Sequence, residues 1–144
     1  MKIFTDFKFK NHELITLKKI SEYWDFWSYE ETLKTLKLKN NYLIYHYDEK
    51  TPNEWLSLLL FSYNHSICEI LFIFVDQNFR HQGLGMTTLM TLEKKLKKEF
   101  GYSKVYLEVN ENSLHAIKLY KKFGMSLLSI RKKYYKNKDN ALIF

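Results

Sequence analysis

Two closely spaced glycines, Gly83 and Gly85, follow Arg80 in a stretch that could bind a phosphate group. An apolar run, residues 70–75, comes before them, and an amphipathic run, residues 87–100, comes after. The pattern predicts a buried strand, a short loop and then a helix. Such a loop gathers unpaired backbone N–H groups at the positive end of the helix dipole, which suits a phosphate. Glycine has no Cβ, so the backbone can take a positive φ and approach a ligand closely.

The glycine spacing excludes two common phosphate-binding loops. No Gly-Lys-Ser/Thr sequence follows, as a kinase-type P-loop requires, and no third glycine stands at the offset of the dinucleotide-binding fingerprint. A glycine pair alone is weak evidence, because turns are rich in glycine. The strand before it and the helix after it supply the context that a phosphate loop needs.

Two further side chains could take part in proton transfer. Glu108 is a carboxylate in the otherwise apolar strand predicted over residues 104–110, and Tyr120 is a phenol on the inner face of the last predicted helix. A carboxylate can act as a general base and a phenol as a general acid. From spacing alone, a solvent-facing glutamate and a packed core tyrosine are the simpler interpretations.

The hydrophobic patterns place these residues in an α+β fold. We predict a mixed, mostly antiparallel sheet of about seven strands with about four helices, in a single domain over residues 1–144. Short connections favour antiparallel neighbours, and the consecutive apolar positions of residues 66–76 favour a central strand. The expected strands are 2–9, 42–47, 54–63, 66–76, 104–110, 125–135 and 140–144, with a turn at 48–53, and the expected helices are 11–24, 28–38, 85–100 and 112–123.

Capping residues predict where the helices begin and end. Asn11 is expected to cap the first helix, and Ser28 begins the second with a Ser-x-x-Glu capping box. Asn112 or Ser113 is expected to cap the last helix, and Gly124 to end it. The positions expected to face the core are Leu14, Ile15, Leu17, Ile20, Tyr23 and Trp24 in the first helix, Leu89, Leu92, Leu96 and Phe100 in the third, and Leu114, Ala116, Ile117, Tyr120 and Phe123 in the last.

Composition limits the class of protein. The chain has 144 residues and is 46% hydrophobic, which is enough for a core. No apolar run is long enough to span a bilayer and no N-terminal signal pattern is present, so we expect no membrane partner and a cytoplasmic location. The one cysteine, Cys68, cannot form an internal disulfide and is expected in the core. His65, His81 and His115 are not spaced as a metal set, so no metal is expected.

The net charge of +7 has two interpretations. Lysines concentrate in residues 94–98 and 118–122, which fits solvated helix faces. The same lysines could instead create a field that attracts phosphate groups or an RNA-rich partner. Solvated helix faces are a sufficient explanation for most of these lysines.

Three motifs together resemble the GNAT superfamily of N-acetyltransferases. The Arg80-x-x-Gly83-x-Gly85 loop resembles its acyl-CoA pyrophosphate loop. Leu107-Glu108-Val109 followed by residues 116–125 is similar to its second signature. Residues 131–135 and 139–142, with Trp27 near the second helix, resemble the branch of protein N-terminal acetyltransferases, above all the RimI-like ribosomal-protein-alanine acetyltransferases.

The resemblance implies acetyl transfer from acetyl-CoA, with Glu108 as the base and Tyr120 as the acid. Backbone groups of a central strand splayed from its neighbour would bind the oxyanion and the pantetheine, and the glycine loop would bind the pyrophosphate. Trp27, Tyr134 and Tyr135 would border the substrate slot. The implied cofactor-binding residues are Ile73, Phe74, Val75, Arg80, His81, Gln82, Gly83, Leu84, Gly85, Met86, Asn112 and Ser113.

One position departs from the pattern of the resembling branch. That branch usually has Asn three residues before the alanine of the last helix, where this chain has Ser113, and Asn112 stands one residue earlier. Both residues could contact CoA, or both could serve only as helix caps. The two interpretations stay open from the sequence.

The amine to be acetylated can be argued from protonation. An α-amino group has a pKa near 8, so roughly a quarter is neutral at about pH 7.4, whereas a lysine with a pKa of about 10.4 is only ~0.1% neutral. A protein N-terminus therefore needs only a mild base. By resemblance, the expected substrate is the N-terminal alanine of small-subunit ribosomal protein 18, with no DNA partner.

Two other functions fit the same sequence. One is acetylation of a small amine such as a polyamine or an antibiotic, and the other is a basic binding module without catalysis. The pair Tyr134-Tyr135 favours a peptide over a polycation, for which an acidic pocket is expected. Nothing in the sequence indicates the oligomeric state.

Overall fold

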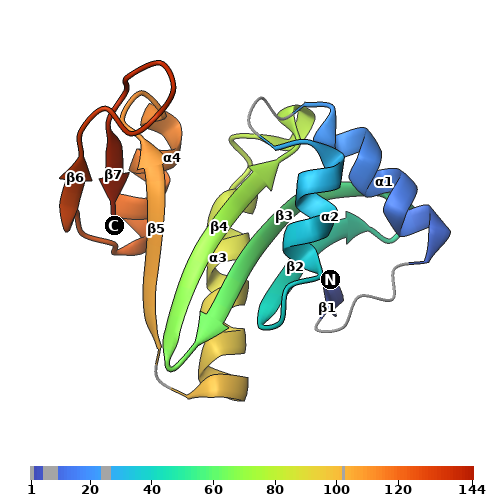
Figure 1. The fold of residues 1–144 in the computed structure, drawn as a ribbon. Coiled ribbons are helices and arrows are strands. Elements are labelled where there is room, and N and C mark those ends of the chain that lie inside the picture. The colour runs from blue at the N-terminus through green and yellow to red at the C-terminus, as the bar shows by residue number, and fades with distance from the viewer. Residues whose placement is uncertain (1, 5–9, 24–26, 102) are drawn as a thin grey trace.

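A single mixed sheet forms the centre of the structure, a computed structural model that describes residues 2–4, 10–23, 27–101 and 103–144. Its strand order is β1-β2-β3-β4-β5-β7-β6, with β4 and β5 parallel and the other neighbours antiparallel (Figure 1). This confirms the predicted fold class. The seven strands are β1 Lys2–Phe4, β2 Asn41–Asp48, β3 Thr51–Asn64, β4 Ile67–Val75, β5 Lys104–Asn110, β6 Ser129–Arg131 and β7 Ala141–Ile143.

Helices cover both faces of the sheet. α1 (Asn11–Ser21) and α2 (Tyr29–Leu36) lie on one face, and α3 (Leu84–Lys95) and α4 (Leu114–Phe123) lie on the other (Figure 1). A short 3-10 helix, η1 (Gln77–Phe79), follows β4. Within the described ranges, no helix is long and apolar enough to cross a membrane.

The central strands are buried on both faces because their alternating side chains enter two separate cores. Leu43 of β2 packs with Leu17 and Leu36 beneath α1 and α2, whereas the adjacent Ile44 packs with Leu89 beneath α3. All five side chains are at most 1% exposed. Burying one such side chain stabilises the fold by about 1.5–3 kcal/mol. Each helix therefore packs on the face of the sheet where its apolar side chains are buried.

The sheet opens between β4 and β5, and this opening organises the site. The two strands pair only from Ile67 to Ile70 on β4, against Lys104 to Leu107 on β5. In the β3–β4 ladder the register shifts at Leu71, which is a β-bulge and bends the strand. Beyond the bulge, β5 pairs with β7 instead of β4. β4 and β5 therefore diverge toward the end of β4 (Figure 1). The predicted splay is therefore present, and the bulge that causes it was not visible in the sequence.

The start of α1 differs from the prediction. Lys10, not Asn11, occupies the N-cap position, because Lys10 has extended backbone angles and Asn11 is already helical. The Glu13 carboxylate accepts the Lys10 backbone N–H at 3.0 Å. Ile15 and Tyr23, predicted to face the core, are 69% and 61% exposed, so those predictions are wrong. The core-facing stripe of α1 is narrower than its apolar residues suggested.

The other helix ends match the prediction in part. The Ser28 hydroxyl accepts the Glu31 N–H at 3.1 Å, and the Glu31 carboxylate accepts the Ser28 N–H at 2.8 Å, which confirms the capping box. Gly124 ends α4 with a φ of +103°. Leu114 was expected to face inward but is 68% exposed, so that prediction is wrong. Trp24 lies outside the described residues.

Three other boundaries were wrong. The predicted third helix continues past Lys95 as a π-helix, η2 (Leu96–Phe100), rather than as an α-helix. The turn expected over residues 48–53 is tighter, because the Asp48 carboxylate accepts the Lys50 N–H and β3 begins at once. The closing hairpin has only three residues in each strand, because residues 132–140 form a wide turn. Residues 5–9 of the expected first strand lie outside the described part.

Candidate active site

The predicted phosphate loop leads from β4 through η1 to α3. Gly83 takes a φ of +81°, the left-handed region, and stands at the N-cap of α3. A Cβ added there would meet nothing within 4 Å, so glycine is needed for the backbone angle and the position stays open to a ligand. The residues from His81 to Gly83 are exposed, as a binding loop requires. The first N–H groups of α3 have no partner within the helix.

Gly85 also has a packing role that the sequence did not indicate. A Cβ at Gly85 would lie 2.9 Å from Leu119 Cδ2 of α4. Gly85 therefore lets α3 and α4 pack closely, and its contact with CoA stays a prediction. The rings of His81 and His115 also meet across these elements, with centroids 5.6 Å apart. Together these contacts hold α4 beside the loop.

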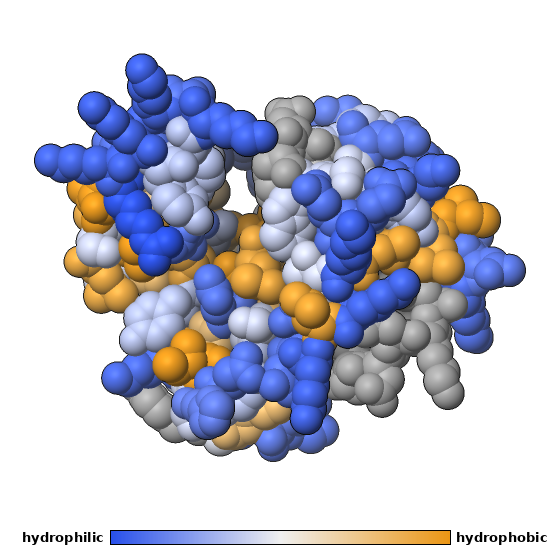
Figure 2. Space-filling view, viewed as in Figure 1, coloured by the Kyte–Doolittle hydropathy of each residue, from blue (hydrophilic) through white to orange (hydrophobic). Residues whose placement is uncertain are grey.

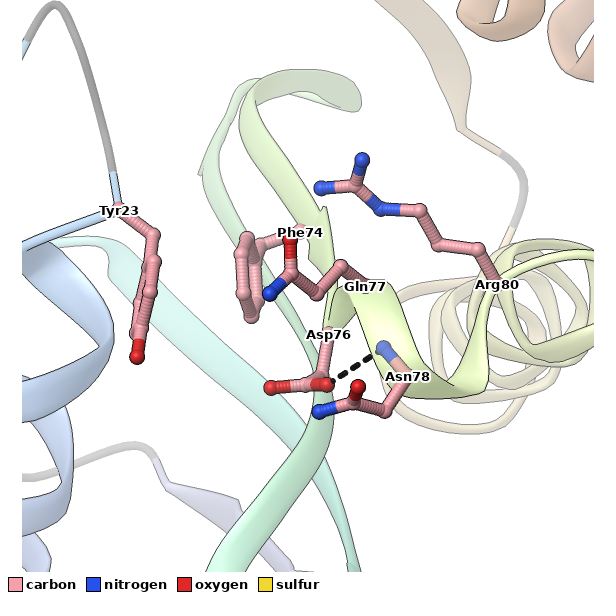
Figure 3. Close-up of a pocket in the computed structure, with 6 residues that line it drawn as sticks. All are labelled: Tyr23, Phe74, Asp76, Gln77, Asn78 and Arg80. Atoms are coloured by element: carbon pink, nitrogen blue, oxygen red, sulfur yellow. Dashed lines mark hydrogen bonds between the residues drawn. The ribbon is translucent and has the colours of Figure 1, made fainter.

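Arg80 turns back over the end of β4. Its Nε donates a hydrogen bond to the Val75 carbonyl at 3.1 Å. Its guanidinium lies over a pocket with Phe74 and Gln77 beneath it and Tyr23, in the turn after α1, opposite (Figure 3). In the same pocket Asp76 accepts the Asn78 N–H at 2.8 Å. Arg80 thus lies at the end of β4, and its contact with a pyrophosphate stays a prediction.

Glu108 lies on β5 one residue beyond the last pair with β4, at the point where the sheet opens. Its carboxylate is 25% exposed and forms an ion pair with Arg131 of β6, Oε1 to Nη1, at 2.7 Å. This partner of Glu108 was not predicted from the sequence. In the sequence, Arg131 is visible only as the arginine three residues before Tyr134 in the tail motif. Its contact with Glu108 depends on the register across β7, which the sequence does not show.

Tyr120 projects from α4 into the core and is only 5% exposed. Burial raises the pKa of its phenol to about 12, and the nearby Tyr135 adds to this. Burial, the Glu108 carboxylate and Tyr134 raise the pKa of Tyr135 in turn. Tyr135 therefore feels the charge of Glu108, and Tyr120 that of Tyr135.

The three predicted substrate residues divide between the two sides of the opening. Tyr134 and Tyr135 meet edge to face on the β6–β7 side, with ring centroids 5.2 Å apart. Arg131 lies over the Tyr134 ring, its Cζ 5.5 Å from the centroid. Trp27 packs on Phe72 of β4, with centroids 6.3 Å apart. The space-filling view shows the molecule hollowed between these two sides (Figure 2).

The two alternatives for Asn112 and Ser113 are not resolved by their contacts. Ser113 occupies the N-cap of α4, but its side chain makes no cap hydrogen bond. The Asn112 backbone N–H is bonded to Asn110 Oδ1 at 2.8 Å. Hydrogen bonds from Asn110, Asn137 and Asn112 lower the pKa of Asp139. Both residues are exposed, and their contact with CoA stays a prediction.

Cys68 lies in the core, as predicted. It is fully buried on β4, and burial raises the pKa of its thiol to about 12, which disfavours a nucleophilic role. Among the residues with described positions, no group of three or more His, Cys, Asp or Glu side chains could hold a metal ion.

Residues 9–125 match the acetyltransferase (GNAT) family. The chain belongs to this family. The segment similar to the spermine/spermidine N(1)-acetyltransferase of Bacillus subtilis is 37% identical over 51 residues, 35% of this chain and 34% of that protein. The segment similar to the [ribosomal protein bS18]-alanine N-acetyltransferase of Escherichia coli is 37% identical over 67 residues, 46% of this chain and 45% of that protein. The chain thus matches less than half the length of these curated relatives.

Solved structures agree with this family in fold. The crystal structure of the Escherichia coli ribosomal-protein-S18-alanine N-acetyltransferase aligns with a TM-score of 0.78 at 21% identity, over 99% of this chain and 90% of that one. That of Arabidopsis thaliana NAA60 in complex with acetyl-CoA aligns with a TM-score of 0.76 at 15% identity, over 94% and 93%. At these identities the likeness establishes the fold.

Proposed function

We propose that this chain, acting as a single domain, transfers the acetyl group of acetyl-CoA to the α-amino group of a protein N-terminus. The observation that carries the proposal is the place of Glu108, on β5 one residue beyond the last pair with β4, where the sheet opens. Membership of the acetyltransferase (GNAT) family supports acetyl transfer. The similar Arabidopsis structure, which contains acetyl-CoA, supports the co-substrate.

Two backbone segments would hold acetyl-CoA, which supplies the acetyl group as a thioester. The N–H groups from His81 to Met86, at the start of α3, suit its diphosphate. The edge of β4 from Ile73 to Val75, unpaired with β5, suits the amides of the pantetheine arm and the carbonyl oxygen. Arg80, Asn112 and Ser113 lie beside these segments as further candidates. The geometry fits a ligand that follows the opening from α3 into the sheet.

The side chains at the opening divide the proton transfers between them. The Glu108 carboxylate takes a proton from the substrate ammonium, directly or through water, and the neutral amine then attacks the thioester carbonyl. The Tyr120 phenol donates a hydrogen bond toward the leaving thiolate. A phenol with a pKa of about 12 is a much weaker acid than a thiol of about 8.5, so full transfer is uphill by about 5 kcal/mol. Tyr120 therefore acts mainly by a hydrogen bond to the thiolate sulfur. Proton transfer to the sulfur is completed only as CoA leaves.

A protein N-terminus fits this site better than a lysine side chain does. Its amine is partly neutral near pH 7, so a carboxylate with a quarter of its surface exposed is base enough. Tyr134 and Tyr135 on one side and Trp27 on the other could flank an extended peptide. The similarity to the Escherichia coli enzyme makes the N-terminal alanine of ribosomal protein bS18 the first substrate to test. Such a substrate implies a cytoplasmic site of action.

A small amine is the second candidate, because the Bacillus subtilis relative is named for spermine and spermidine. One assay separates the two. The protein is incubated with acetyl-CoA and a panel of N-terminal peptides, including an alanine-first peptide, beside spermidine and free lysine, and products are read by mass. We expect an added acetyl group on the peptide α-amine. Acetylation of spermidine alone would contradict the proposal.

A further inference from the structure

The Glu108–Arg131 contact is an ion pair between strands. It joins β5 to β6 across β7 at 2.7 Å. Two other ion pairs, Lys95–Glu99 and Lys97–Glu93, join residues four apart along the α3–η2 helix, where neighbours in sequence meet automatically. The pair at the opening instead depends on how the hairpin docks.

The register explains how Arg131 reaches Glu108. Ile143 lies between Ser129 and Glu108 in one row of the sheet, and Ala141 lies between Arg131 and Asn110 in the next. Residues two apart on a strand share a face, so Arg131 and Glu108 point to the same side. The small Ala141 leaves the long arginine side chain a path across β7.

Hydrogen bonds tie the turn that follows β6 to the residue after β5. Asn140 Oδ1 accepts the Lys133 N–H at 3.0 Å, and Glu111 at the end of β5 accepts two hydrogen bonds from Asn140, at 2.8 and 3.0 Å. The ring of Tyr134 supports the other face of the guanidinium. The guanidinium thus lies with the Glu108 carboxylate and the Tyr134 ring, on the β6 side of the opening.

We propose that Arg131 determines substrate specificity, by occupying the Glu108 carboxylate and making the amine slot unfavourable for polycations. The inference rests on the proposed function. Arg131 contacts Glu108 through Oε1, and a carboxylate has a second oxygen, Oε2, that can receive the single ammonium of a peptide N-terminus. A polyamine brings several positive charges toward the same arginine and is repelled more strongly.

The surroundings of the pair strengthen this discrimination. Lys132, Lys133, Lys136 and Lys138 lie on the same hairpin turn and are all exposed. The space-filling view shows hydrophilic side chains projecting from this part of the molecule (Figure 2). The Arg131 side chain is 54% exposed, so its attraction to Glu108 is of the weak kind typical of surface pairs. An incoming ammonium can therefore share or take the carboxylate.

The test compares selectivity in two hairpin variants. For each protein, kcat/KM is measured with spermidine and with an alanine-first tetrapeptide, and the ratio of the two is taken. Arg131→Gln is expected to raise the spermidine-to-peptide ratio about fivefold, mainly through a lower KM for spermidine, as loss of about 1 kcal/mol of repulsion would. Arg131→Lys keeps the charge and should leave the ratio within about twofold of the wild type.

Lys132→Gln is the matched control, because it removes the same charge from the same hairpin without touching Glu108. Its ratio is expected to stay near that of the wild type. The effect of Arg131→Gln should also shrink in about 1 M salt, where charges are screened within about 3 Å. A role that is only structural would lower the midpoint of thermal unfolding and leave the ratio and its salt dependence unchanged.

The outcomes separate this inference from the proposed function. Peptide acetylation with an unchanged ratio in Arg131→Gln would overturn the role of Arg131 and leave the N-terminal activity standing. If the wild type acetylates spermidine but not the peptide, the proposed function fails. A rise in spermidine kcat/KM in Arg131→Gln would then still support the charge effect. A protein that acetylates neither amine contradicts both.

Discussion

A Cβ on Gly85 would lie 2.9 Å from Leu119 Cδ2, so α3 and α4 approach as closely as the absence of a side chain allows. Gly85→Val is therefore expected to lower the free energy of unfolding by about 1–3 kcal/mol, the usual cost of overpacking. Urea unfolding measures this. Adding Leu119→Ala should recover at least about 0.5 kcal/mol relative to the sum of the single changes. Additive single changes would contradict the contact.

Gly83 is expected to matter for CoA binding as well as for the backbone. Gly83→Ala should cost about 1–2 kcal/mol of stability, because alanine disfavours the left-handed region. Gly124 also has a positive φ and open surroundings. It lies at the C-terminal end of α4, outside the proposed phosphate loop. Gly124→Ala should therefore cost a similar amount of stability. Only Gly83→Ala should weaken CoA binding by calorimetry, and equal CoA affinity in both variants would remove the loop from the proposed site.

Glu108→Gln should reduce kcat/KM most at low pH. There the substrate amine is protonated and needs a base, whereas at high pH it is already neutral and the loss should shrink. The measurement is the pH profile of kcat/KM with the alanine-first peptide. Glu69→Gln on β4, an exposed strand glutamate, is the control and should keep the wild-type profile. A Glu108→Gln profile equal to the wild type would refute the base.

Tyr120→Phe should slow turnover by about tenfold or more while CoA affinity stays near that of the wild type, because only the hydroxyl is removed. Weaker CoA binding instead would indicate a packing role. With a pKa of about 12, the phenol stays protonated across the usual assay range, so it should add no basic limb to the wild-type kcat profile below about pH 11.

The same phenol predicts a pH dependence of stability. Its pKa is about 12 when folded and about 10 when unfolded, so the stabilisation is complete below pH 10 and is lost as the pH rises to 12. The loss is about 2–3 kcal/mol at the upper end. Tyr45 and Cys68 have raised pKa values as well, so the wild type loses more than this. Tyr120→Phe should lose less stability than the wild type over this range, in urea unfolding at pH 10 and 12.

A buried hydrogen-bond chain fixes the first turn of α3. The Thr88 hydroxyl donates to the Leu84 carbonyl at 2.8 Å, so Ser57 must donate to Thr88, and His46 Nδ1–H to Ser57, both at 2.8 Å. Ser57→Ala removes both of its 2.8 Å hydrogen bonds and leaves between His46 Nδ1 and Thr88 Oγ1 only their 3.3 Å contact, so it should cost about 1–3 kcal/mol in urea unfolding. It should also weaken CoA binding, because the chain ends beside the phosphate loop.

Thr32→Val is the control for this chain. Thr32 is also buried and also donates to the carbonyl four residues back, but it lies in α2, far from the loop in the fold. Its loss should reduce stability and leave CoA affinity unchanged. A Ser57→Ala protein with normal stability would show that the hydrogen-bond chain contributes little.

Local features could be predicted from the sequence because their causes lie within a few residues. The Ser28 capping box, the Gly124 helix end and the strand–loop–helix around Gly83 depend on backbone geometry and neighbouring side chains. The α+β class and the core position of Cys68 followed from hydrophobic patterns in the same way. These features would form in much the same way wherever the segments were packed.

The tertiary structure decided what depends on residues far apart in the chain. The bulge at Leu71 opens the sheet, and it exists only relative to the register of β3. Gly85 is a packing residue because Leu119 happens to lie above it, and Glu108 has a cationic partner because β7 brings Arg131 within reach. Composition and spacing determined which side chains could do chemistry here. Register and helix packing determined which of them meet, because those contacts are set by the whole sheet rather than by any one segment.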